Sequence, residues 1–257
     1  MSSVKSAFKA LTSEQQALVK ERQIAGKHSP DEWLSLLGPV AAFDEQVDAV
    51  RKGGGGFWDR RFARKHDVPD GLRTFALPLL PIVREDHDPA VPLELQIDLT
   101  GAEQTSKTAS TSAPYKKGNY PAVVDTFYVD PWLKGHARFV DGADIHFSVI
   151  DHVRASRKTK RSASGKTKQK TKRKRKIEFA VTVSLPARNY AATSAPPAAT
   201  VEGIRKASVE SESDRTVVKL SRTVIPQFAD TPPGIEPLLE LIGAAYGRVD
   251  PTRRKKL

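Results

Sequence analysis

A run of twenty residues, 157–176, contains twelve Lys or Arg and no acidic residue. Repulsion among these cations, together with the Ser-Ala-Ser-Gly sequence near the centre, excludes a stable helix there. The segments on both sides alternate apolar and polar residues, which is typical of half-buried strands. We therefore expect the two flanking segments to pair antiparallel, with the basic run forming a long disordered loop, 156–176, of an enlarged β-hairpin.

The basic charge of the chain is concentrated in this run. The 257 residues include 42 Lys and Arg and 30 Asp and Glu, which gives a formal net charge of +12. Without the twelve cations of the run, basic and acidic residues are equal in number. Without the basic tail as well, Arg253, Arg254, Lys255 and Lys256, the remainder is slightly acidic. This distribution indicates a nearly neutral folded body that carries one cationic segment.

The composition excludes several classes of protein. Hydrophobic residues make up 39% and charged residues 28%, so the body is able to form a globular core. The absence of cysteine excludes disulfides, thiolate zinc sites and cysteine nucleophiles. No apolar run approaches the roughly 20 residues that span a bilayer, and the first residues lack a secretion signal. We expect an intracellular, cytoplasmic protein, nuclear in a eukaryotic cell, with no membrane partner.

Helix signals dominate residues 1–66. Ser13 and Gln16 have capping-box spacing, and Gly26 would end the first helix. Ser29 and Glu32 predict a second helix start, closed by Gly38. Apolar residues at helical spacing, Val40, Phe43, Val47 and Val50, predict a third helix that ends at the flexible glycines 53–56.

Alternation replaces helical spacing after Gly71. Expected strands include 93–99, 123–129, 135–140, 144–153 and 178–185, and a hairpin joins 204–209 to 216–225. The segments 104–114 and 191–200 read as flexible connections, and Leu238, Leu239, Leu241 and Ile242 predict a short helix. The fold class is α+β, with N-terminal helices packed on a largely antiparallel sheet. Its parts are a helical region 1–66, a β-rich body 72–249 and the tail 250–257, although the helices could equally cover the sheet within a single domain.

Nucleic acid is the expected partner of the basic run. A cationic segment near a phosphate backbone releases condensed counterions and needs no preformed pocket. No aromatic residue lies within the run, and its eight lysines outnumber its four arginines, so backbone contacts to DNA or RNA are favoured over base recognition. The predicted binding residues are Arg157, Lys158, Lys160, Arg161, Lys166, Lys168, Lys170, Lys172, Arg173, Lys174, Arg175 and Lys176, with a secondary contact from Arg253, Arg254, Lys255 and Lys256.

Two other functions are open at this stage. The chain could be a subunit of a complex or virion whose basic loop binds an acidic protein partner, or whose residues 172–175 act as a targeting signal. It could also be a hydrolase that uses the polar strand face Asp144, His146, Ser148 and His152, with Glu178 across the hairpin. The two histidines are about 20 Å apart at strand rise, too far to share one zinc ion. We expect no catalytic residue, metal or cofactor.

Two further clusters have simple structural interpretations. Residues 85–88 contain three carboxylates and a histidine before a proline, which predicts a solvated acidic loop. Trp58 and Phe62 lie among Arg60, Arg61, Arg64 and Lys65, so their rings are either part of the core or a secondary nucleic-acid contact.

Overall fold

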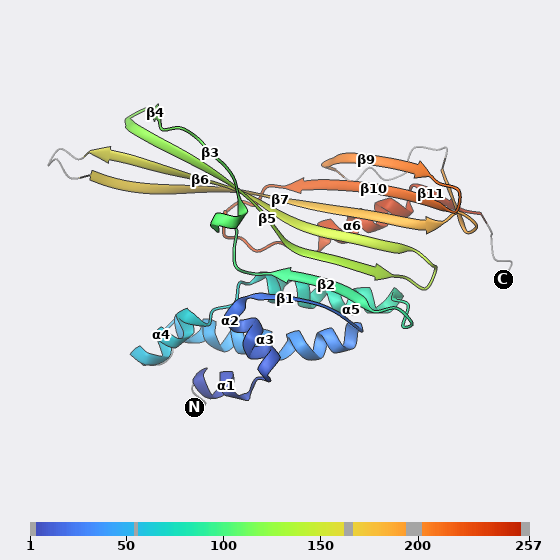
Figure 1. Ribbon diagram of the computed structural model, residues 1–257, viewed down its shortest axis with the longest axis horizontal. Coiled ribbons are helices and arrows are strands. Elements are labelled where there is room, and N and C mark those ends of the chain that lie inside the picture. Colours follow the sequence, from blue (N-terminus) through green and yellow to red (C-terminus); the bar gives the residue numbers. More distant parts are fainter. Residues whose placement is uncertain (1–3, 54–55, 162–166, 194–201, 253–257) are drawn as a thin grey trace.

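The computed structural model describes residues 4–53, 56–161, 167–193 and 202–252. Within these residues a nine-stranded antiparallel sheet dominates the fold (Figure 1). Its main path follows the order β1-β2-β5-β6-β7-β10-β9, and β3 and β4 both pair with β5. The strands are β1 Gln23–His28, β2 Leu93–Asp98, β3 Thr108–Thr111, β4 Tyr115–Lys117, β5 Tyr120–Arg138, β6 Asp144–Arg161, β7 Thr167–Pro186, β9 Ile204–Ser211 and β10 Arg215–Val224, while β8 Tyr190–Ala192 and β11 Val249–Pro251 form a separate pair.

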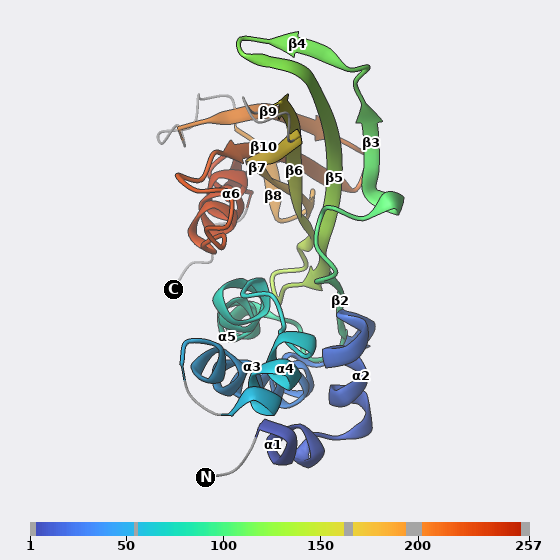
Figure 2. The ribbon, with the colours of Figure 1, turned by 90° about the vertical axis from the view of Figure 1, so that its left-hand side faces the viewer.

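Helices cover one side of the sheet. Figure 2 shows α5 and α6 on the same side, with the remaining helices beyond α5. One hydrophobic cluster joins the helices to the sheet, and Phe75 contacts both Trp132 of β5 and Phe179 of β7. The predicted α+β class is confirmed. The helices are α1 Val4–Ala10, α2 Ser13–Glu21, α3 Pro30–Arg51, α4 Phe57–Lys65, a π-helical turn Leu72–Ala76, α5 Leu77–Asp86 and α6 Glu236–Tyr246.

No helix in the described parts of the chain is long and apolar enough to cross a membrane. The predicted C-terminal helix is confirmed as α6, which packs on β7 and β10. The hairpin expected near residues 204–225 is confirmed as β9 and β10. The tail residues Arg253 to Lys256 lie outside the described residues, as do residues 194–200 of the expected connection 191–200. The first residues of that connection, Ala191 and Ala192, are not a free link but belong to β8, which pairs with β11.

The first part of the chain differs from the expected run of helices. The capping box of α2 uses Thr12 and Gln15, one residue earlier than the sequence suggested. The helix ends at Glu21, because Arg22 adopts a left-handed conformation with φ 57°. Residues 23–28 then form β1 at the edge of the sheet, paired with β2. Sheet pairing here prevails over the weak helical pattern of a short apolar segment.

The second and third expected helices are one continuous helix, α3. Its capping box at Ser29 and Glu32 is confirmed. Gly38 does not end it, although Pro39 follows inside the helix. Proline has no N–H group, so the carbonyl of Ser35 loses its usual donor from four residues ahead. The buried side chain of Gln15 donates to the Ser35 oxygen at 3.3 Å, and this replaces the missing bond.

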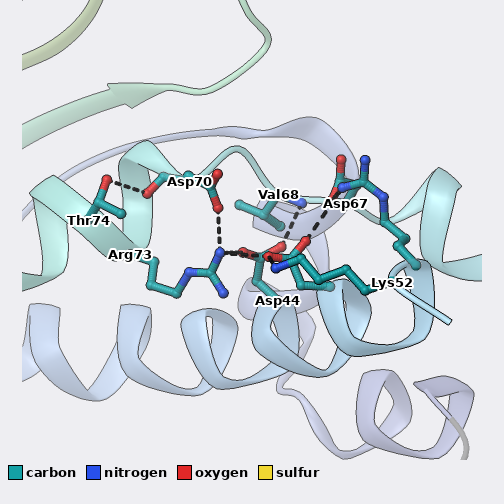
Figure 3. Close-up of polar contacts among 9 residues, drawn as sticks. Asp44, Lys52, Asp67, Val68, Asp70, Arg73 and Thr74 are labelled. Atoms are coloured by element: carbon teal, nitrogen blue, oxygen red, sulfur yellow. Dashed lines mark hydrogen bonds and ion pairs between the residues drawn. The ribbon is translucent and has the colours of Figure 1, made fainter. Parts of the chain in front are cut away.

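An ionic cluster holds α3 to the segment before α5 (Figure 3). The carboxylate of Asp44 is 2% exposed and accepts a 3.1 Å hydrogen bond from the Val68 N–H. Arg73 pairs with Asp48 at 2.9 Å and also with Asp70. Burial raises the pKa of Asp44 to about 6, because its desolvation outweighs the Val68 bond and the more distant Arg73 charge.

The strands around β5 are longer than the alternation indicated. The expected strands 123–129 and 135–140 belong to one strand, β5, with an irregularity in its pairing between Asp130 and Leu133. The segment 104–114, expected to be a flexible connection, supplies β3 instead. Its residues Thr108–Thr111 pair along β5. Short polar residues lack bulk to bury but satisfy their backbone groups by extending an existing sheet edge.

Candidate nucleic-acid interface

The basic run forms a paired ribbon and not the expected disordered loop. β6 and β7 stay in register from Asp144↔Ser184 to Arg161↔Thr167, so the prediction for 156–176 is wrong wherever the structure describes that segment. Residues 162–166, including Lys166, lie outside the described residues. Alternation places the lysines on one face and Arg157, Arg173 and Arg175 on the other, with same-face residues along one strand about 7 Å apart. Backbone pairing therefore holds the ribbon together although lysines lie directly opposite one another.

The ribbon and its neighbours extend beyond the helices (Figure 1). We call this part the arm. It comprises residues 120–130 of β5, 151–161 of β6 and 167–177 of β7, with β3 and β4 along the outer side of β5. On its other side β10 pairs with β7 only from Ile177 onward. The arm therefore displays most of its basic residues away from the packed core.

The register separates lysine from arginine. Residues directly opposite each other in a ladder share one face of the sheet. The pairs Lys158↔Lys170 and Lys160↔Lys168 lie on one face, whereas Arg157↔Thr171 lies on the other. The first face, here the lysine face, carries Lys158, Lys160, Lys168, Lys170, Lys172, Lys174 and Lys176; the second, the arginine face, carries Arg157, Arg173 and Arg175. Arg161 lies at the end of β6, opposite Thr167.

The arginine face has intramolecular partners. Arg175 pairs with the carboxylate of Asp151 at 2.6 Å and donates to the Thr231 carbonyl at 2.8 Å. Asp151 is 9% exposed, and burial raises its pKa although the Arg175 charge opposes this. Arg173 binds Glu103, with Nη2 3.0 Å from Oε2. Arg157 donates to the side-chain oxygen of Gln169. These arginines connect the arm to itself and to the loops beside it.

The lysine face has no carboxylate partner within the described residues. None of its seven lysines forms an ion pair or side-chain hydrogen bond there. The ammonium of Lys158 lies 5.1 Å from the centre of the Tyr120 ring. Like charges directly opposite each other in a sheet repel, and a bound anion would reduce this repulsion.

Residues distant in sequence complete the lysine face. In the ladder, Phe127 of β5 lies opposite Arg154 of β6, which lies opposite Lys174 of β7. Two adjoining hollows of 560 and 200 Å³ share Arg154 and Lys174 in their linings, and Phe127 lines the larger and Tyr115 the smaller. The absence of aromatics from the run itself argued against stacking at the level of sequence. The rings come from β4 and β5, and only strand pairing could have revealed them.

The polar face proposed for hydrolysis is divided between two groups. His146 stacks on His136 of β5, with ring centres 4.2 Å apart. His152 contacts Glu178 at 2.9 Å, as the hairpin pairing predicted, within the hollow of the lysine face. Burial lowers the pKa of His146, and the neighbouring His136 adds to this effect. Among the described residues no group of three His, Asp, Glu or Cys side chains is placed to hold a metal ion.

The two smaller clusters also differ from expectation. Glu85 and Asp86 end α5, and His87 forms a bridge to Phe139, so the segment 85–88 is only partly a loop.

In α4, Phe62 packs on the rings of Phe8 and His66, whereas Trp58 is 68% exposed. The core interpretation therefore holds for one ring and not for the other.

Comparison with known proteins adds no assignment to these sites: no protein-family model, curated protein or solved structure matches this chain.

Proposed function

We propose that this is a non-enzymatic protein that binds DNA or RNA through the lysine face of its arm, by backbone contacts that are mostly independent of sequence. The observation that carries the proposal is the lysine face itself, which gathers seven lysines without intramolecular ion pairs among the residues that the structure describes. Phosphates are the natural partners for such a surface, because binding releases counterions from the polyanion. A protein with this partner acts inside the cell, in the cytoplasm or, in a eukaryotic cell, in the nucleus.

The spacing of the lysines and the ordered backbone of the ribbon favour a polyanion over a single small anion as the ligand. Same-face lysines on β7 recur about every 7 Å. A DNA strand presents a phosphate about every 3.4 Å along its axis, so successive lysines can each meet a separate phosphate. The paired ribbon also loses less conformational entropy on binding than a disordered loop of equal charge.

The paired arginines have a different role in this proposal. Arg173 and Arg175 hold Glu103 and Asp151, so their charges are less available to a ligand than those of the lysines. The proposed contact set is therefore the lysine face with Arg154, which is narrower than the whole basic run. The basic tail remains a proposed second contact.

The test compares two triple variants that remove equal charge. The first, K170Q/K172Q/K174Q, changes exposed residues of the lysine face. The control, K5Q/K9Q/K20Q, changes exposed residues of α1 and α2. Binding to duplex and single-stranded DNA is measured across a salt series.

We expect the slope of log affinity against log salt to decrease by about 0.7–0.9 for each phosphate that the first variant no longer neutralises. The slope of the control should match that of the wild type, because its lysines lie away from the arm. Equal slopes for the wild type and the first variant would disprove the proposal.

A further inference from the structure

The larger hollow of the lysine face has both apolar and cationic walls. Phe127 and Val129 of β5 form one side, and Arg205 and Thr223 lie among its lining residues from β9 and β10. Between them lies a floor that includes Arg154, Lys174 and Lys176. The volume of 560 Å³ falls within the range of small-molecule sites, about 300–1,000 Å³. The hollow is therefore large enough for a flat ring with an attached charged group.

The apolar wall is exposed although it lies within a paired strand. Phe127 is 40% exposed and Val129 is 38% exposed, although both lie in the middle of a long paired strand. No aromatic ring of the described residues packs against Phe127, and cations occupy the next two positions of its cross-strand row. A ring beside guanidinium and ammonium groups offers a stacking surface together with anion contacts.

We infer that this hollow binds an unpaired base of single-stranded nucleic acid, which stacks on Phe127 while Arg154 and Lys174 contact the adjoining phosphates. The inference rests on the proposed function and specifies its substrate. Single strands can turn a base out to meet an aromatic side chain, whereas duplex bases are already stacked on each other. The smaller hollow beside Tyr115 continues the same path, because it shares Arg154 and Lys174 with the larger one.

The position of Tyr115 favours a continuous binding path for a nucleic-acid strand. Its hydroxyl donates to Asp125 at 2.9 Å, which fixes the ring on the lysine-face side of β5. Bonds from the hydroxyls of Ser156 and Tyr115 lower the pKa of Asp125, so the carboxylate is charged and stabilises this arrangement. Asp125 is 7% exposed, and the neighbouring charges of Arg154 and Lys117 partly offset its negative charge.

The experiment uses the full chain and three labelled probes: an oligothymidylate, a DNA duplex of equal length and an inorganic polyphosphate. The test variant is Phe127→Ala, with Phe127→Tyr as the conservative replacement. Phe228→Ala is the matched control, because Phe228 is also exposed, at 62%, and lies outside both hollows. Loss of one base stack corresponds to a factor of about ten in affinity.

We expect Phe127→Ala to weaken oligothymidylate binding about tenfold. Its affinity for duplex and polyphosphate, and its salt slope, should match those of the wild type. Phe127→Tyr should retain single-strand binding, which separates stacking from any effect on folding. An unchanged oligothymidylate affinity, or an equal loss for all three probes, would overturn the inference and leave the proposed function standing. A wild-type protein that binds none of the probes would overturn both.

Discussion

The two faces of the arm share one stretch of sequence and differ in what their charges contact. The arginine face pairs with Asp151, Glu103 and Gln169, whereas the lysine face has no acidic partner in the described parts of the chain. A count of basic residues does not distinguish the two faces. Strand alternation therefore separates cations that stabilise the arm from cations that are available to a ligand.

The largest expected effect comes from a comparison of neighbouring residues. Arg175→Gln leaves Asp151 buried without its partner, which typically costs about 3–5 kcal/mol of unfolding free energy. Lys174→Gln, on the other face, should change stability by no more than about 0.5 kcal/mol. Urea denaturation of both variants measures the difference. Equal losses would show that the faces do not differ in structural role.

Asp44 extends the contrast between buried and exposed charge to the helical layer. Burial raises its pKa to about 6, so the folded protein keeps a proton that the unfolded chain has released. The contribution of Asp44 to the unfolding free energy is therefore complete below the unfolded pKa of 3.8 and is lost as pH rises through about 6. The shift corresponds to about 3 kcal/mol. We expect the unfolding free energy of the wild type to fall relative to Asp44→Asn by about this amount between pH 3 and pH 7. Parallel pH profiles would contradict the assignment.

A smaller effect is expected for single charges in nucleic-acid binding. Lys172→Gln should weaken duplex binding about threefold and reduce the salt slope by about 0.9. Arg173→Gln should change the slope by less than half as much, because Glu103 already neutralises the guanidinium. Fluorescence anisotropy across a salt series measures both. A larger effect for Arg173 would reverse the comparison of the faces.

The smallest expected effect tests whether an arginine can be released for binding. Glu103→Gln removes the partner of Arg173, whose side chain is 54% exposed. The stability change should stay below about 1 kcal/mol, as for other exposed pairs. Duplex affinity should rise about twofold, because one cation becomes available. A decrease in affinity would indicate that the pair is needed to position the arm.

Local pattern predicted much of the fold. Ser29 and Glu32 marked the start of α3, and alternation on both sides of the basic run predicted the β6–β7 pairing. The continuation of α3 through Gly38 and Pro39 was not predictable, since the compensating donor is Gln15, twenty residues before Ser35. Local rules describe a helix's own hydrogen bonds and cannot reveal a donor from another element.

The candidate site was predicted in position and not in detail. The cationic residues were identified, but their division between faces depends on the strands continuing past Val153. Phe127 and Tyr115 join the site through pairing between strands remote in sequence, which no spacing within the run indicates. The same applies to Glu103, seventy residues from Arg173.

The incomplete pairing of β7 has a consequence for the solution behaviour of the protein. From Thr167 to Lys176 the described strands leave its far edge uncovered, since β10 begins to pair only at Ile177. Bare edges of this kind invite another chain to add on, and lysine is a common deterrent. The lysines of β7 are thus placed to oppose such edge-to-edge pairing by charge repulsion. Dense polyanions that cancel their charge would then bring copies of the protein together edge to edge.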